Sequence, residues 1–237
     1  MKMKRSGSKN FSDILTILLV IVIIGIIALL IYFGYKAIDK KKTEDANAEA
    51  VEEFKSVVLD DDDDDSDDTT ADLSDFITET DYSSSSSSGR TKTYLDEYEV
   101  KGIIEIPATG IEYSILESAT VGSLSKAVGI LEIATCDEIT ETVTDLNVKG
   151  TNALILGHNY RNGQFFSDND QLELGDIIKI TDQLGETVTY TIYNMYYTTS
   201  DDISFLEREL DPDVREITLQ TCNDDSSQRL IIWAKDS

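Results

Sequence analysis

One uninterrupted apolar segment constrains this chain more than any other feature. Residues 14–33 carry no charge and span about 30 Å as an α-helix, which matches the hydrocarbon core of a bilayer. A buried core helix of this length would be unusual, because the segment has no polar face. A cleaved signal peptide would have a shorter apolar region followed by small residues, whereas the segment here is followed by Tyr35-Lys36-Ala37-Ile38. We therefore predict an uncleaved transmembrane anchor over residues 14–35, with the lipid bilayer as its partner.

Basic residues flank this segment almost equally, so the positive-inside rule is nearly balanced. They are Lys2, Lys4, Arg5 and Lys9 before it, and Lys36, Lys40, Lys41 and Lys42 after it. The long polar tract and the compact region that follow favour an external C-terminus. We expect a single-pass protein of the cell membrane, with residues 1–13 as a basic cytoplasmic N-terminus and an extracytoplasmic C-terminal domain.

The stretch from residue 36 to residue 97 predicts a tether. Glu44–Leu59 has apolar residues at helical spacing, which indicates a short amphipathic helix near the membrane. The runs Asp60–Asp65 and Ser83–Ser88 cannot bury apolar surface, and we expect a disordered acidic and serine-rich spacer there. Calcium binding by the aspartates is disfavoured, because the spacing of an EF-hand loop is missing.

Composition excludes several classes of function. The net charge of −26, from 46 acidic and 20 basic side chains, argues against a nucleic-acid partner, since phosphates require Lys and Arg. Cys136 and Cys222 are the only cysteines and His158 is the only histidine, so a disulfide-dense scaffold is excluded. A structural zinc site would need a fourth strong ligand beyond these three. We predict no metal and no cofactor.

From residue 98 to residue 237 the sequence predicts a mainly β domain. Short runs rich in Ile, Val, Thr and Tyr alternate with turn residues, which is typical of a small barrel or sandwich. The eight predicted strands are 100–106, 111–116, 128–133, 153–157, 176–181, 187–196, 216–221 and 229–235, and helical turns are expected at 123–128 and 203–210.

Three side chains at predicted strand ends are candidates for chemistry. Cys222 ends the strand before a polar loop, and Arg229 opens the next strand, so the two can approach each other across antiparallel strands. His158 likewise ends an apolar strand, after Gly157. Each residue also has an ordinary structural interpretation: a small buried thiol, a histidine without catalytic function, and an arginine that reaches solvent.

The motifs around these residues resemble those of the sortase family. Thr218-Leu219-Gln220-Thr221-Cys222 with the downstream Arg229 resembles the sortase Thr-Leu-x-Thr-Cys signature. Leu156-Gly157-His158-Asn159 is similar to the sortase histidine segment, and Gly102–Pro107 is similar to the first strand of the family. The resemblance covers residues 98–237 in the usual family order, and it implies an eight-stranded sortase-type β-barrel.

The resemblance also implies a cysteine transpeptidase with three assigned roles. Cys222 would attack the carbonyl of a Thr–Gly bond in the C-terminal sorting signal of a secreted protein and form a thioacyl enzyme. His158 would protonate the leaving amine and then deprotonate the incoming one, while Arg229 would orient the substrate and stabilise the oxyanion. Thr221 is a further candidate for holding the substrate.

The resemblance leaves the substrates and the subclass open. Both LPxTG-like and NPxTG-like signals are compatible with it, and the amine acceptor is either a peptidoglycan precursor or a pilin lysine. Asn159 after the histidine, and a helix in the 197–215 connection, favour class B, although that connection is short for this class.

Three other functions and one cysteine require explanation. A papain-like thiol hydrolase has its Cys before its His, which is the reverse of the order here, and a non-catalytic display domain would not bring Cys222, His158 and Arg229 together. A thiol–disulfide enzyme would need a Cys-x-x-Cys motif, which is missing. Cys136 is interpreted as a core or surface thiol, because a disulfide with Cys222 would block catalysis except as a reversible redox lock.

Overall fold

The computed structural model describes residues 8–59, 92–139 and 142–236, which fall into two compact units, Met1–Asp45 and Ala46–Ser237. The first unit contains most of helix α1 (Ser8–Leu59), whose large apolar side chains from Ile14 to Ile38 are all exposed. By length and composition this helix could cross a membrane. The predicted acidic and serine-rich runs lie outside the described residues.

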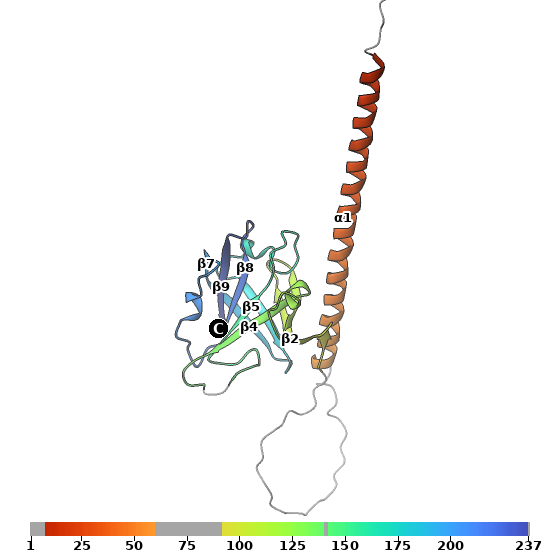
Figure 1. Ribbon diagram of the computed structural model, residues 1–237. Helices are drawn as coiled ribbons and strands as arrows, with labels where there is room; N and C mark the ends of the chain where they lie inside the picture. Colours follow the sequence, from red (N-terminus) through yellow and green to blue (C-terminus); the bar gives the residue numbers. More distant parts are fainter. Residues whose placement is uncertain (1–7, 60–91, 140–141, 237) are drawn as a thin grey trace, which may run out of the picture. The chain divides into compact units, whose positions relative to one another are not determined.

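The described part of the second unit contains nine strands, and each of the eight predicted strands is present within a few residues of its expected bounds (Figure 1). Their bounds are β1 Tyr94–Leu95, β2 Tyr98–Ile106, β3 Ile111–Leu116, β4 Val128–Thr135, β5 Thr151–Leu156, β6 Ile177–Asp182, β7 Thr187–Thr199, β8 Glu216–Cys222 and β9 Gln228–Asp236. The two-residue strand β1 was not predicted, because it is too short to show an alternating pattern.

The strands form one sheet that closes into a barrel. The order is β2-β3-β4-β5-β8-β9-β7-β6, and pairing of β6 with β2 completes the circle, while β1 adds to the start of β2. The pairs β3–β4 and β5–β8 are parallel and the others are antiparallel. Closure leaves no free edge among these eight strands, which confirms the mainly β, eight-stranded barrel expected from the sequence.

The helical turns are shorter than the sequence suggests. They are 3₁₀ turns, η2 at Ser123–Ser125 and η4 at Ser204–Leu206, and a third turn, η3 at Asn169–Gln171, was not predicted. The predicted helix at 203–210 stops early because the chain turns back after Leu206, with Phe205 buried against the outside of the barrel.

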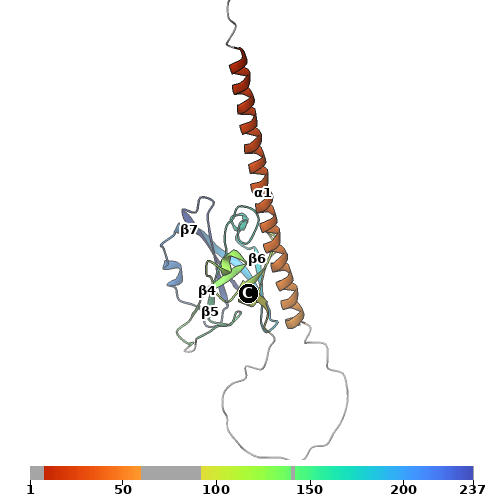
Figure 2. The same ribbon diagram turned by 45° about the vertical axis from the view of Figure 1, so that its right-hand side comes forward.

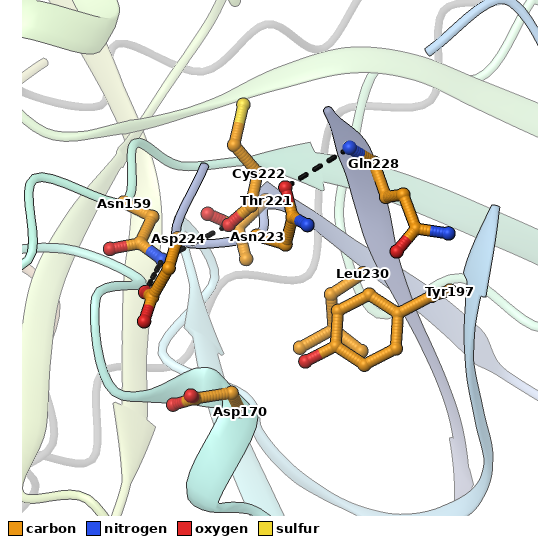
Figure 3. A pocket seen from close by; sticks show the side chains of 9 residues that line it. All are labelled: Asn159, Asp170, Tyr197, Thr221, Cys222, Asn223, Asp224, Gln228 and Leu230. Carbon is orange, nitrogen blue, oxygen red and sulfur yellow. Dashed lines mark hydrogen bonds between the residues drawn. The ribbon is translucent and has the colours of Figure 1, made fainter. Parts of the chain in front are cut away.

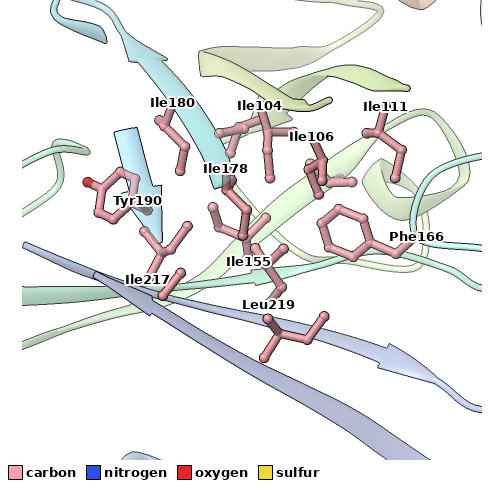
Figure 4. Close-up of a cluster of buried hydrophobic side chains, with 14 of the residues drawn as sticks. Ile104, Ile106, Ile111, Ile155, Phe166, Ile178, Ile180, Tyr190, Ile217 and Leu219 are labelled. Atoms are coloured by element: carbon pink, nitrogen blue, oxygen red, sulfur yellow. The ribbon is translucent and has the colours of Figure 1, made fainter. Parts of the chain in front are cut away.

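The barrel interior is filled mainly by aliphatic side chains, with a few aromatic ones among them (Figure 4). Ile104, Ile155, Ile178 and Leu219 are each completely buried there. Burial of one such side chain contributes about 1.5–3 kcal/mol, so the interior is the main source of stability. A separate cluster on the outer face of the sheet includes Leu154, Ile231 and Trp233. Neighbouring residues along β8 and β9 therefore face opposite sides.

The end of α1 belongs to the same compact unit as the barrel (Figures 1 and 2). From Ala46 onward its apolar face, including Val51 and Phe54, packs in a cluster with residues of β1, β2 and β3 and with Ala127, just before β4. Asn47 is buried within this contact: its Oδ1 accepts a hydrogen bond from the Ser114 N–H at 2.9 Å, and its Nδ2 donates to the Lys126 carbonyl at 3.1 Å. The amphipathic pattern of Glu44–Leu59 thus reflects packing on the domain.

Candidate active site

The topology brings the three predicted residues to adjacent strand ends. In the antiparallel β8–β9 ladder, Cys222 is the direct partner of Arg229. In the parallel β5–β8 ladder, Leu156 pairs with Gln220, and the Gly157 N–H donates to the Gln220 carbonyl at 3.1 Å. Counted two residues past the last pair of this ladder, the same register aligns the position of His158 with that of Cys222. The order β5-β8-β9 therefore places the histidine and the arginine on either side of the cysteine.

Gly157 is required for this approach. A Cβ atom added at this position would lie 2.5 Å from the ring of Phe166, which is completely buried in the barrel. The Phe166 N–H also donates to the His158 carbonyl at 3.1 Å. The chain after β5 is therefore held against the core where it presents the histidine.

Cys222 lies at the rim of a cavity of about 210 Å³ (Figure 3). The thiol is free and partly exposed, so a substrate can reach it. In the figure its sulfur points away from Asp170 and Tyr197 on the far side of the cavity. The cavity is lined by Asn159, Asp170, Tyr197, Thr221, Cys222, Asn223, Asp224, Gln228 and Leu230.

Thr221 lines the same cavity from the opposite face of β8. It pairs with Leu230, a residue of the interior cluster, whereas Cys222 pairs with Arg229. Thr221 is 5% exposed, and its hydroxyl has no hydrogen-bond partner in the described part of the chain. A buried hydroxyl without a partner carries a desolvation cost that a bound ligand could relieve.

His158 and Arg229 do not line this cavity. The imidazole is half-buried, and burial lowers its pKa below the ordinary value. The Arg229 guanidinium donates to the carbonyls of Gln228 and Ser226, at 3.2 and 3.4 Å. Within the described residues it forms no ion pair with a carboxylate, so its charge is available for a ligand.

The family model described as the sortase domain matches residues 104–237, more than half of the chain. The chain belongs to the sortase family. This assignment confirms the resemblance and identifies the protein as a transpeptidase.

Among solved structures, this sortase is similar to the lid mutant of sortase A from Corynebacterium diphtheriae, with 26% identity and a TM-score of 0.50 over 60% of this chain and 72% of that chain. The Clostridium perfringens sortase D5 transpeptidase has 29% identity and a TM-score of 0.48, covering 58% and 79% of the two chains. Sortase C from Clostridium perfringens SM101 has 24% identity and a TM-score of 0.47, covering 58% and 70%. No curated protein matched the sequence. Class B stays a prediction, because the match to the sortase domain does not resolve the class.

The sortase site contains two further residues that sequence reasoning missed. The Asn159 Nδ2 donates to the Cys222 carbonyl at 3.1 Å and to the Asp224 carboxylate at 3.3 Å, so it connects the histidine segment to the cysteine loop. The ring of Tyr160 stacks on His158 with centroids 4.8 Å apart. Asn159 was part of the histidine motif, but its bond to the cysteine loop had no sequence signal, and Tyr160 was marked only by its position two residues after the histidine.

Cys136 lies just beyond β4, buried and free. Its N–H donates to the Gly150 carbonyl at 2.9 Å, which anchors the chain at that point. Both cysteines are free thiols in this structure, and among the described residues no group of three or more His, Cys, Asp or Glu could hold a metal ion.

Proposed function

We propose that this sortase is a membrane-anchored enzyme that cleaves a Thr–Gly bond in the C-terminal sorting signal of secreted proteins and transfers the acyl group to an amine. Cys222 is the nucleophile, His158 is the general acid and base, and Arg229 binds the substrate and the oxyanion. The observation that supports this assignment best is the register of three neighbouring strands, in which Arg229 is paired with Cys222 and His158 follows β5 at the matching position.

The first half-reaction forms a thioester. The reactive form of a cysteine is the thiolate, so the Cys222 proton passes to the imidazole as sulfur attacks the threonine carbonyl. The Arg229 guanidinium, which lacks a carboxylate partner among the described residues, stabilises the negative oxygen that develops. The carbon–nitrogen bond then breaks, and the imidazolium gives its proton to the departing glycine amine.

The second half-reaction regenerates the enzyme. Neutral His158 removes a proton from the incoming amine as its nitrogen attacks the thioester carbonyl. The carbon–sulfur bond breaks, and the thiol recovers its proton from the imidazolium. Burial of His158 lowers its pKa, which favours the neutral imidazole needed for this step and makes the imidazolium a stronger acid in the first.

The substrates in this proposal are those that the resemblance to sortases implies. The sorting signal is an LPxTG-like or NPxTG-like peptide, and the acceptor is an amine of a peptidoglycan precursor or a pilin lysine. The unpartnered hydroxyl of Thr221, buried next to the nucleophile, is a candidate hydrogen-bonding group for the bound peptide.

Residues 14–35 of α1 form the anchor in this proposal, with residues 1–13 in the cytoplasm and the barrel outside. The side chains from Ile14 to Phe33 are apolar and exposed, as expected for contact with lipid. Secreted proteins and cell-wall amines would then meet the enzyme on the same side of the membrane.

The test uses the full chain in detergent micelles with a panel of sorting peptides, with and without an amine acceptor, followed by intact mass spectrometry. We expect an acyl adduct on the wild type that the amine discharges to ligated product. Cys222→Ala should form no adduct, and the matched variant Cys136→Ala should behave like the wild type. Hydrolysis that no acceptor diverts would contradict transpeptidation, and an adduct that persists in Cys222→Ala would contradict the assignment of the nucleophile.

A further inference from the structure

In the described part of the chain, no hydrogen bond fixes the orientation of the His158 imidazole, which is unusual for a general acid and base. In most such sites a third group hydrogen-bonds one ring nitrogen and fixes the ring. No side chain or carbonyl in the described part of the chain hydrogen-bonds this ring. The neighbour with a defined geometry is Tyr160, whose ring lies 4.8 Å from the imidazole with an interplanar angle of 27°.

Tyr160 is itself held by the core. Its ring contacts Phe165 at a centroid distance of 5.7 Å, and Phe165 contacts Tyr113 at 5.1 Å. Phe165 and Tyr113 both belong to the buried interior cluster. A continuous series of aromatic contacts therefore runs from the barrel interior to the imidazole.

The backbone around Tyr160 is fixed as well. The Tyr160 N–H donates to the Ser167 hydroxyl at 3.1 Å, and Asn159 forms an isolated antiparallel bridge with Phe165. These bonds close residues 159–167 into a tight loop, so the Tyr160 ring has a defined position although 45% of the residue is exposed.

We propose that Tyr160 is a positioning residue for His158: its stacked ring holds the imidazole in the plane that serves Cys222. This inference rests on the proposed function, in which His158 transfers protons. A stacking partner contacts the face of the imidazole and leaves both ring nitrogens free, which suits a group that must first donate and then accept a proton. The tyrosine hydroxyl has no part in this role, so phenylalanine should replace tyrosine and leucine should not.

The first test is magnetic resonance of the imidazole, which is unambiguous because His158 is the only histidine. The full chain with ¹³C-labelled histidine, and no added histidine tag, would be measured in micelles. Stacking on an aromatic face shifts the imidazole C–H resonances upfield. We expect the same upfield shift in the wild type and Tyr160→Phe, and its loss in Tyr160→Leu. An unchanged shift in Tyr160→Leu would overturn the proposal.

The second test is activity with a peptide that the wild type ligates. Tyr160→Leu should lose about tenfold in kcat with little change in KM, because a misplaced base slows proton transfer more than it weakens binding. Tyr160→Phe should stay within about twofold of the wild type, as should Tyr94→Leu, a matched change of an exposed tyrosine on β1. Wild-type kcat in Tyr160→Leu, or a loss in Tyr160→Phe as large as in Tyr160→Leu, would overturn the proposal.

The two tests separate this inference from the proposed function. If the wild type ligates no peptide, the proposed function fails, while the resonance shift still reports whether Tyr160 orients the imidazole. If the wild type is active and Tyr160→Leu matches it, only the positioning role fails. Cys222, Arg229 and Asp224 could also influence the imidazole, and they are identical in all the variants.

Discussion

The two ends of the β8–β9 ladder differ in whether their charged side chains are paired with one another. At the end where Glu216 pairs with Lys235, Arg215 donates from Nη1 to Asp236 at 3.2 Å and from Nη2 to Glu186 at 3.0 Å. At the other end, Cys222 and Arg229 face each other, and within the described residues neither is paired with a charged side chain.

The interior side of the first end is also fully paired. The buried Tyr190 hydroxyl donates to the Asn147 Oδ1 at 2.8 Å, and the Asn147 Nδ2 donates to the Glu186 carbonyl at 2.9 Å and to the Asp182 carboxylate at 3.3 Å. At the opposite end the hydroxyl of Thr221 has no partner among the described residues. Paired buried groups stabilise a fold, whereas unpaired ones cost free energy and are available to a substrate. One end should therefore respond to mutation in stability and the other in activity.

Of the substitutions that test this difference, removal of the His158 imidazole should have the largest effect on activity. His158→Ala should lower kcat/KM by about 10²–10⁴-fold, because it removes the proton-transfer group, and should leave unfolding unchanged. Ligation kinetics measure the first quantity. Urea unfolding followed by the fluorescence of Trp233, the only tryptophan, measures the second. Activity within tenfold of the wild type would remove His158 from the mechanism.

Arg229 and Arg215 lie at opposite ends of the ladder, so substituting each of them tests the two ends with the same chemical change. Arg229→Ala should lower kcat/KM by about 10²-fold through loss of oxyanion stabilisation, with little change in stability. Arg215→Ala should cost about 1–3 kcal/mol of unfolding free energy, because it leaves the Asp236 Oδ2 and the Asn147 carbonyl without their side-chain donor, and should preserve kcat in the folded fraction. The same assays apply. The comparison fails if the two substitutions exchange their effects.

The chain pattern alone predicted a mainly β domain, either a barrel or a sandwich, with three candidate side chains at strand ends. The resemblance to the sortase family then specified the eight-stranded barrel and the roles of those side chains. Strands such as Glu216–Cys222 alternate between interior and exterior residues over their full length, which is a local signal. Cys222, His158 and Arg229 stand where such strands begin or end, next to motifs shared with the sortase family. Their convergence then follows from strand order.

The remaining features depend on contacts between distant parts of the chain. The Asn147 side chain forms its hydrogen bonds with residues 33 to 43 positions away, and no local sequence pattern marks it as the centre of a buried network. Tyr160 meets His158 only because the 159–167 loop folds back through the bridge between Asn159 and Phe165. The contact of Phe54 with the barrel likewise crosses the long segment between α1 and β1.

Acidification should lower activity, which depends on the active-site end, at a higher pH than it lowers stability, which depends on the paired end. Burial lowers the pKa of His158, so the acid limb of kcat/KM should lie below the ordinary histidine value of about 6.5. Glu99 lies near the paired end, where Gln183 and Lys101 bond to it. Burial raises its pKa, but hydrogen bonds from Lys92, Gln183 and Lys101 outweigh this and lower the pKa to about 2.

A depressed carboxyl pKa contributes stability that is present above the unfolded value near 4.5 and is lost as the pH falls toward 2. Activity should therefore decline on acidification while the fold is still intact. Glu99→Gln should make the free energy of unfolding less dependent on pH in the acid range. It should leave the acid limb of kcat/KM at the same pH as in the wild type. Ligation kinetics and urea unfolding, each measured over the same series of pH values, give these two quantities. If activity and stability fell at the same pH, the loss of activity would be due to unfolding.

The smallest effects should come from two threonines on β8 that differ in pairing. The Thr218 hydroxyl is buried and donates to the Asn152 Oδ1 at 3.0 Å, whereas the Thr221 hydroxyl has no partner in the described part of the chain. Thr218→Val should cost about 1–2 kcal/mol of unfolding free energy, since it leaves Asn152 unsatisfied, and should preserve KM. Thr221→Val removes an unpaired hydroxyl at constant shape, so stability should hold or rise slightly while KM for the sorting peptide increases about threefold. Equal stability losses would mean that Thr221 is paired in solution, by water for example, and an unchanged KM would show that the peptide does not use its hydroxyl.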